Sequence, residues 1–257
     1  MIRGIILDLD GTVYRGDCEI DGAGEFCTNM KSKGVRCLFV TNRSNRTPDE
    51  IQAQLNRYGI ACSVEDIMTT SMAAAKHVGT GSAYMVGEEG LRQALEEQGI
   101  TITEDRPDYV IVGWDRFVTF DKLKIATRLI HEGATFIATN PDPRLTTHEG
   151  IFPGTGAIVA AIKTAAEQEP LVIGKPEPLL FNEAIDILGI DRMHVIAVGD
   201  SLDTDVAAGC KAEIRTALML TGHSRREDVV ASDYTPTWIC SSFVDLERII
   251  AEEEASP

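Results

Sequence analysis

Short apolar runs alternate along this chain with segments whose apolar residues recur at helical spacing. The first run, residues 5–7, contains no polar residue, as expected of a parallel strand that is buried on both faces. A second run covers residues 36–40, and between the two Phe26, Cys27 and Met30 fall on one face of a predicted helix. A strand, a helix and another strand in this order predict an α/β sheet with right-handed crossovers.

Capping residues mark the ends of the first two predicted helices. Asp21 is expected to cap the helix that carries Phe26, and Gly34 is expected to end it. Residues 47–50 (TPDE) form a capping box with proline at the first helical position. A second helix is therefore predicted to run to about Tyr58.

The alternation restarts after residues 79–82 (GTGS), a predicted linker, and again after residue 169. The later predicted strands are residues 83–86, 109–112, 135–138, 170–173, 194–198 and 216–220. Helices are predicted through Leu91 and Leu95, through Leu123 and Ile130, over 157–166, up to Leu188 and over 205–212. We expect a doubly wound parallel-sheet core (residues 1–79 and 170–257) with a smaller α/β cap domain (residues 80–169) inserted into it.

Polar residues follow four of the predicted strands. They are Asp8 and Asp10, Thr41 and Asn42, Lys175, and Asp200 with Asp203 and Asp205 close behind. Because open α/β sheets bind ligands beyond the carboxyl ends of their strands, we expect these side chains to share one edge. Several carboxylates around one point repel one another unless a cation lies between them, and hard oxygen ligands suit Mg²⁺.

An edge of this kind supports phosphoryl transfer. A carboxylate beside Mg²⁺ can attack phosphorus and form an aspartyl-phosphate, while the Lys175 ammonium and the Thr41 hydroxyl hold the phosphoryl oxygens. A second carboxyl two residues further on can protonate the leaving oxygen and later deprotonate water. Gly11 leaves room for a tight backbone turn around the phosphoryl group.

Four ordered motifs resemble those of the haloacid dehalogenase superfamily of phosphatases. They are DLDGT at 8–12, VTN at 40–42, GKP at 174–176 and GDSLDTD at 199–205. The long interval between the second and third motifs resembles members whose cap is inserted there. More narrowly, ATNPD at 138–142 and PGTGA at 153–157 resemble the NagD and 4-nitrophenylphosphatase subfamily, class II subclass A.

The resemblance implies a role for each matched residue. Asp8 matches the nucleophile and a Mg²⁺ ligand, and Asp10 the general acid/base whose backbone carbonyl also meets the metal. The remaining matches are Thr41 and Asn42 for phosphate binding, Lys175 for ordering nucleophile and phosphate, and Asp200 as third metal ligand. Asp205 matches a supporting carboxylate at the metal site, beside metal-bound water or Lys175. Relatives often carry asparagine at the position of Arg43. The resemblance therefore does not imply the detail of the contact with phosphate or leaving group at this position. Asp203 is expected to face solvent.

The loop over residues 140–154 is the predicted specificity element. Caps of this type lower a loop over the phosphate site, and Arg144 and His148 are the polar residues best placed to contact the leaving group; the alternative is a solvated loop. Residues 154–157 (GTGA) lack the third glycine of a dinucleotide loop, and no predicted strand abuts them. A tight turn into a helix is the better interpretation.

Composition limits the class of partner. A formal charge of −16 over 257 residues argues against nucleic acid, which needs a basic face. The chain shows neither a membrane-spanning stretch nor a signal-peptide pattern, so a cytoplasmic location is expected. The six scattered cysteines fit reduced packing residues rather than disulfides or a zinc site. The resemblance also implies a homodimer through the cap.

These patterns together predict a Mg²⁺-dependent phosphomonoester hydrolase that acts on small phosphorylated metabolites, such as sugar phosphates, nucleotides or aryl phosphates. A receiver-type signalling domain, which also uses an aspartyl-phosphate, is a rival interpretation. Receivers are about half this length and lack a carboxylate two residues after the phosphorylated one. A catalytically silent metabolite-binding protein or a phosphotransferase could also be built on the same scaffold.

Overall fold

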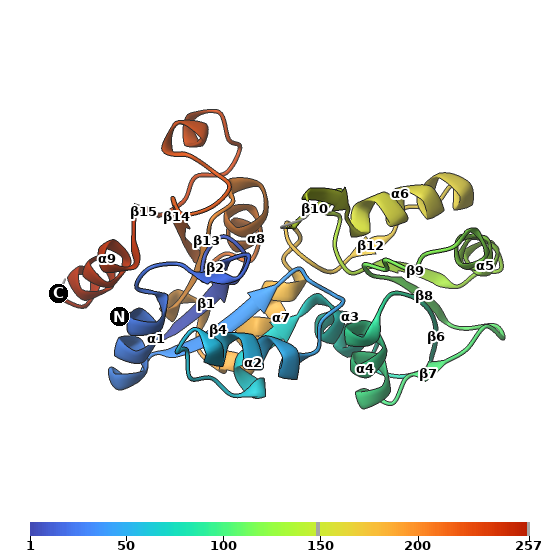
Figure 1. Ribbon diagram of the computed structural model, residues 1–257, viewed down its shortest axis with the longest axis horizontal. Coiled ribbons are helices and arrows are strands. Elements are labelled where there is room, and N and C mark those ends of the chain that lie inside the picture. Colours follow the sequence, from blue (N-terminus) through green and yellow to red (C-terminus); the bar gives the residue numbers. More distant parts are fainter. Residues whose placement is uncertain (148–149, 256–257) are drawn as a thin grey trace. The chain divides into compact units, whose positions relative to one another are not determined.

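The computed structural model describes residues 1–147 and 150–255, which form two compact units (Figure 1). The core consists of residues 1–41, 51–68 and 175–257, and the cap consists of residues 42–50 and 69–174. The sequence-based boundary at 79/80 differs from this division. Gly79 is the C-cap of a cap helix and Ser82 begins a cap strand, so residues 79–82 are a turn inside the cap.

The core is built on a six-stranded sheet, and its strands from β15 to β4 run parallel to their neighbours, as predicted. Its order is β15 (Trp238–Cys240), β14 (Arg215–Met219), β13 (Val195–Gly199), β1 (Gly4–Asp8), β4 (Arg36–Thr41) and β5 (Ile67–Thr69). The chain fills the sheet outward from β1 on one side and from β13 on the other. The topological switch point, where open α/β sheets bind ligands, therefore lies between β1 and β13.

Helices cover both faces of the core sheet. One face packs its apolar side chains on α1 (Ala23–Ser32), α2 (Pro48–Arg57) and α9 (Phe243–Ala255). The rings of Phe26 and Phe243 lie 5.1 Å apart, which brings α1 and α9 together near the chain ends (Figure 1). The remaining core elements are α7 (Leu179–Leu188), α8 (Ala207–Lys211) and the hairpin of β2 (Tyr14–Arg15) and β3 (Cys18–Glu19).

One predicted cap is confirmed and the other is wrong. Thr47 N–H donates to Glu50 Oε2 at 3.0 Å and Glu50 N–H donates to Thr47 Oγ1 at 3.3 Å, which completes the capping box. Asp21 does not cap α1. Gly22 occupies the N-cap position with a φ of 82°, and no side chain caps the helix there.

The cap contains a five-stranded parallel sheet of its own. Its order is β12 (Leu171–Val172), β9 (Thr135–Ala138), β8 (Tyr109–Val112), β6 (Ser82–Val86) and β7 (Thr101–Ile102). Its helices are α3 (Thr70–Val78), α4 (Glu89–Glu97), α5 (Phe120–His131) and α6 (Thr155–Ala166), of which α5 and α6 share one apolar cluster with the sheet. The strand predicted at 170–173 as the start of the second core segment is β12, an edge strand of the cap sheet.

The predicted specificity loop is largely a hairpin. β10 (Arg144–Thr147) pairs with β11 (Gly150–Pro153) in antiparallel register. A strand therefore directly precedes Gly154, contrary to the expectation for that turn. Arg144 is exposed at the start of β10, and His148 lies outside the described residues.

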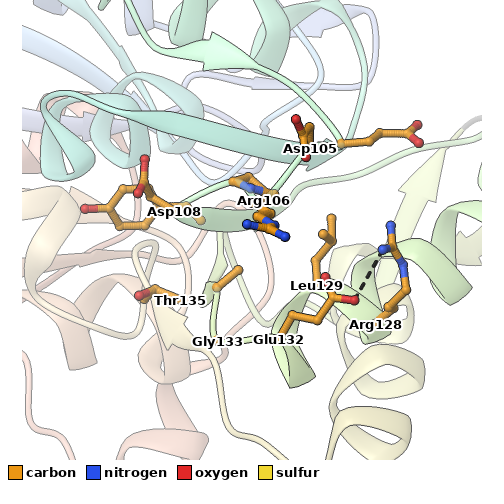
Figure 2. Close-up of a pocket in the computed structure, with 12 residues that line it drawn as sticks. Asp105, Arg106, Asp108, Arg128, Leu129, Glu132, Gly133 and Thr135 are labelled. Atoms are coloured by element: carbon orange, nitrogen blue, oxygen red, sulfur yellow. Dashed lines mark hydrogen bonds and ion pairs between the residues drawn. The ribbon is translucent and has the colours of Figure 1, made fainter.

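A pocket of about 820 Å³ opens at the amino ends of β8 and β9 in the cap (Figure 2). Its lining includes Arg106, Asp108 and Thr135, together with Arg128 and Glu132, which form an ion pair at 3.3 Å. Because parallel sheets bind ligands at the opposite, carboxyl ends of their strands, the pocket is a poor candidate for the site. None of the helices formed by the described residues is long and apolar enough to cross a membrane.

Candidate active site

Three aspartates converge beside the switch point of the core sheet. Asp8 is the last residue of β1, Asp200 follows β13, and Asp205 lies in a π-helical turn over Leu202–Val206. One carboxylate oxygen from each lies within 4.8 Å of the others, and all three side chains are buried. The structure thus brings together Asp8, Asp200 and Asp205, as the sequence predicts, while the exposed Asp203 stays outside the cluster.

Lys175 joins this cluster and is only 3% exposed. Its Nζ donates to Asp8 Oδ1 at 2.5 Å and to Asp205 Oδ1 at 2.6 Å. Lys175 was expected to follow a core strand, but the strand before it is β12 of the cap. The predicted proximity of Lys175 to Asp8 and Asp205 is confirmed. The prediction that a core strand leads into Lys175 is wrong.

Burial and mutual repulsion shape the ionisation of this cluster. Burial raises the pKa of Asp8 well above its ordinary value; Lys175 opposes that rise, and the charges of Asp205 and Asp200 add to it. Burial, followed by the charge of Asp205, raises the pKa of Asp200 to about 6. Burial alone would lower the pKa of Lys175, but its ion pairs with Asp205 and Asp8 raise it. The charge of Lys175 alone therefore does not offset burial and the repulsion among the three carboxylates.

The donor set fits a hard divalent cation. Within the cluster the Lys175 ammonium pairs with two of the three carboxylates, so the four side chains carry a net charge of −2 when all are ionised. Oxygen donors with this charge are the ligands that Mg²⁺ prefers. Gly11 and Gly222 both lie so close to the Asp200 carboxylate that a β-carbon at either position would collide with it. These two glycines leave space around the Asp200 carboxylate.

The segment that follows β14 also holds Asp200, and the sequence analysis missed it. His223 N–H donates to Asp200 Oδ2 at 2.5 Å and Ser224 N–H donates to Asp200 O at 3.0 Å. Thr221 Oγ1 donates to Gly11 O at 2.8 Å. The signal was present, because Thr221 directly follows the predicted strand 216–220, which makes this the fifth strand of the predicted core to be followed by such a polar residue.

The other predicted residues lie on the flanking strand and its continuation. Thr41 is the buried last residue of β4, one position beyond Val40, which pairs in register with Asp8. Asn42 and Arg43 continue from it as the first residues of the cap. Asp10 is half-buried and forms a backbone bridge with Tyr14, and its carboxylate is not one of the three in the cluster. Its carbonyl as a metal ligand therefore stays a prediction.

Comparison with known proteins places this geometry in a family. A model of haloacid dehalogenase-like hydrolases matches residues 5–101, and a HAD-hydrolase-like model matches residues 172–246. An acid sugar phosphatase from Staphylococcus aureus is 40% identical over 98% of both chains. The chain belongs to the haloacid dehalogenase-like hydrolases.

Solved structures extend the likeness to the whole fold. A p-nitrophenyl phosphatase from Archaeoglobus fulgidus is 32% identical, with a TM-score of 0.92 over 96% of this chain and 99% of that one. A 4-nitrophenylphosphatase from Thermotoga maritima is also 32% identical, with a TM-score of 0.91 over 96% and 97%. The predicted α/β fold and the NagD and nitrophenylphosphatase resemblance are confirmed, and the chain is an enzyme of the phosphatase type. The receiver-type interpretation gains no support from these matches.

Proposed function

We propose that the chain is a Mg²⁺-dependent phosphatase of small phosphorylated metabolites, sugar phosphates foremost, and that it works through an aspartyl-phosphate. The observation that carries this proposal is the buried cluster in which Lys175 pairs with Asp8 and Asp205 beside Asp200, with a net charge of −2. The acid sugar phosphatase that resembles the chain over its full length supports the substrate class.

Asp8, Asp200 and Asp205 would hold Mg²⁺ through their carboxylates, with the Asp10 backbone carbonyl as the further ligand that the family resemblance implies. When bound, Mg²⁺ supplies positive charge against the phosphoryl oxygens and lowers the repulsion between them and Asp8.

Asp8 attacks phosphorus in line, forming an Oδ–P bond while the bond from phosphorus to the leaving oxygen breaks. Lys175, fixed between Asp8 and Asp205, orients the nucleophile and keeps it ionised. Asp10 gives its proton to the leaving alkoxide and then removes a proton from the attacking water. That water forms a new bond to phosphorus as the bond to Asp8 breaks, releasing inorganic phosphate and restoring the carboxylate.

Thr41, Asn42 and Arg43 are proposed to bind the phosphoryl oxygens, and Arg144 and His148 the leaving group. Thr41 supports this proposal through its position next to the register partner of Asp8. Arg144 supports it through an exposed side chain on the cap hairpin. If Arg144→Ala leaves kcat/KM unchanged across several phosphate esters, its assignment to the leaving group is wrong.

The proposal is tested by phosphate release over a panel of sugar phosphates, nucleotides and 4-nitrophenyl phosphate with Mg²⁺. Asp8→Asn should abolish turnover while the protein stays folded, because the amide lacks the nucleophilic oxygen charge. Asp203→Asn is the matched control, since Asp203 is an exposed aspartate of the same motif. Full activity of Asp8→Asn, or full activity of the wild type in excess EDTA, contradicts the mechanism. Transfer of phosphate to an added alcohol instead of water would indicate a phosphotransferase.

The predicted small-metabolite partner and the homodimer through the cap stay proposals of the same kind. A molar mass measured in solution by light scattering decides the oligomeric state. A mass near 28.0 kDa would contradict the homodimer.

A further inference from the structure

The residue that follows Thr41 is anchored inside the cap through its backbone carbonyl. Asn42 O accepts hydrogen bonds from Thr70 Oγ1 at 2.8 Å and from Asn140 Nδ2 at 2.7 Å. Both donors are buried, with Thr70 0% and Asn140 4% exposed. A carbonyl oxygen has two lone pairs, so these two donors together satisfy this acceptor.

The segment that supplies Asn140 is itself rigidly held. Asp142 N–H donates to Asn140 Oδ1 at 3.1 Å, and Asn42 Nδ2 donates to Asp142 Oδ2 at 3.0 Å, which closes a ring of three residues. Gly156 N–H donates to Asp142 O at 2.8 Å, and a β-carbon at Gly156 would collide with the Pro141 carbonyl. The ATNPD and PGTGA motifs therefore pack on each other, and together they immobilise Asn42.

A second anchor lies two residues further along the chain. Ser44 O accepts from Ser71 Oγ at 2.7 Å, and Ser44 Oγ accepts from Trp114 N–H at 2.8 Å. Ser44 is also buried. The backbone around Arg43 is thus held on both sides, at Asn42 and at Ser44.

The residue before Lys175 belongs to the same hydrogen-bonded cluster. Gly174 N–H donates to Thr139 O at 2.8 Å. A β-carbon at Gly174 would lie 2.6 Å from both Asn42 Oδ1 and Thr139 O, so only glycine fits there without displacement. The chain neighbours of two site residues, Thr41 and Lys175, therefore meet in one buried network.

We propose that Thr70 and Asn140 are positioning residues for phosphoryl binding. Lys175-Pro176 is the cis bond found in the described part of the chain, so the peptide bond from Asn42 to Arg43 is trans. In a trans peptide the N–H points opposite to the carbonyl. By holding the Asn42 carbonyl, the two donors fix the plane of this peptide and keep its N–H on the side opposite to them. This inference rests on the proposed function, in which residues 41–43 receive the phosphoryl group.

The test compares variants that delete one donor and keep its shape. Thr70→Val and Asn140→Asp each remove a hydrogen bond to the Asn42 carbonyl, and Thr70→Ser retains it. Each deletion should raise KM for 4-nitrophenyl phosphate and the dissociation constant of inorganic phosphate, measured by calorimetry with Mg²⁺, by about fivefold. Thr70→Ser should leave both values at those of the wild type.

Thr119→Val is the matched control, because Thr119 Oγ1 accepts a backbone hydrogen bond at the start of α5 in the same unit. It should lower Tm without changing phosphate affinity. Phosphate affinities in Thr70→Val and Asn140→Asp within about twofold of wild type overturn the inference; an equal loss of affinity in Thr119→Val does so too. If Thr70→Val fails to fold, Asn140→Asp tests the same carbonyl. A wild type that releases no phosphate from any ester would instead contradict the proposed function.

Discussion

The core sheet and the cap sheet both carry acidic residues at their carboxyl edges, but the charges are balanced differently. In the cap, Glu88 follows β6 and accepts from Arg116 Nε at 2.9 Å and from its backbone N–H at 2.9 Å. Asp115 follows β8 and accepts from Lys122 Nζ at 2.6 Å. Each of these two cap carboxylates has a cation of its own, whereas in the core Asp8 and Asp205 share Lys175 and Asp200 lies beside them.

We interpret the paired cap carboxylates as structural and the core carboxylates as the candidate site of the reaction. Position at a strand end brings polar groups together in both sheets, so position alone does not identify the site. The net negative charge of the core cluster suits a cation, which the two paired cap carboxylates do not need. The cap carboxylates are already neutralised, and we expect them to contribute to stability only.

The largest expected effect comes from removing the shared cation. Lys175→Met should lower kcat by about 10²- to 10³-fold, because it deletes a charge that orients the nucleophile and faces the transition state. Lys122→Met removes the corresponding cation in the cap and should leave kcat nearly unchanged. Steady-state kinetics of the two variants in Mg²⁺ measure the contrast. Equal losses of kcat would mean that Lys175 and Lys122 contribute alike to turnover, which contradicts the contrast between the core and cap edges.

The second prediction concerns metal binding. Mg²⁺ at about 100 times its Kd should stabilise the folded core by about 2.7 kcal/mol, because it binds the folded state alone. Asp200→Asn should lose most of this stabilisation, and Asp115→Asn should retain it. Thermal unfolding with and without Mg²⁺ gives both values. An undiminished Mg²⁺ response in Asp200→Asn would remove Asp200 from the ligand set.

A smaller effect is expected from the cap pair of Lys122 and Asp115, of which only Asp115 is buried. Asp115→Asn should lower the free energy of unfolding by about 1–2 kcal/mol, because Lys122 is left without its charged partner but can turn to solvent. Its kcat and KM should match wild type. Denaturant unfolding and kinetics check the two statements, and a loss of turnover without a loss of stability would place Asp115 in the reaction.

The smallest expected effect is on the pH dependence of stability in the absence of Mg²⁺, to which Asp200 and Glu88 contribute with opposite signs. The pKa of Asp200 is raised to about 6, so the stability gained by its protonation is lost as pH rises through 6. Hydrogen bonds from Arg116 outweigh burial and lower the pKa of Glu88, so its stabilisation is present at neutral pH and is lost as pH falls through the lowered pKa.

The measurement is Tm at pH 4 and pH 7 in EDTA. Relative to wild type, Asp200→Asn should gain a few degrees at pH 7 and Glu88→Gln should lose a few, and both differences should shrink at pH 4. The same sign for both variants at pH 7 would contradict the contrast between the two sheets.

Sequence patterns predicted the buried strands well because parallel strands are continuous apolar runs. They predicted the meeting of Asp8, Lys175, Asp200 and Asp205 because motif order places them at strand ends. They did not assign β12 to its sheet, because the sequence pattern of a two-residue edge strand does not depend on which sheet the strand joins. The role of His223 was hidden, because a backbone N–H that binds a carboxylate leaves no mark on residue type.

The cap enters the chain as two pieces, residues 42–50 and 69–174, and this limits how the enzyme can be shortened. Cutting out only the longer piece would leave Ser44 without Ser71 and Trp114, and Asn42 without Thr70 and Asn140. A minimal core would therefore need a redesigned connection after Thr41 as well as a new approach to Lys175. The same constraint applies to evolution, since a cap exchanged between relatives has to carry its partners for residues 42–45 with it.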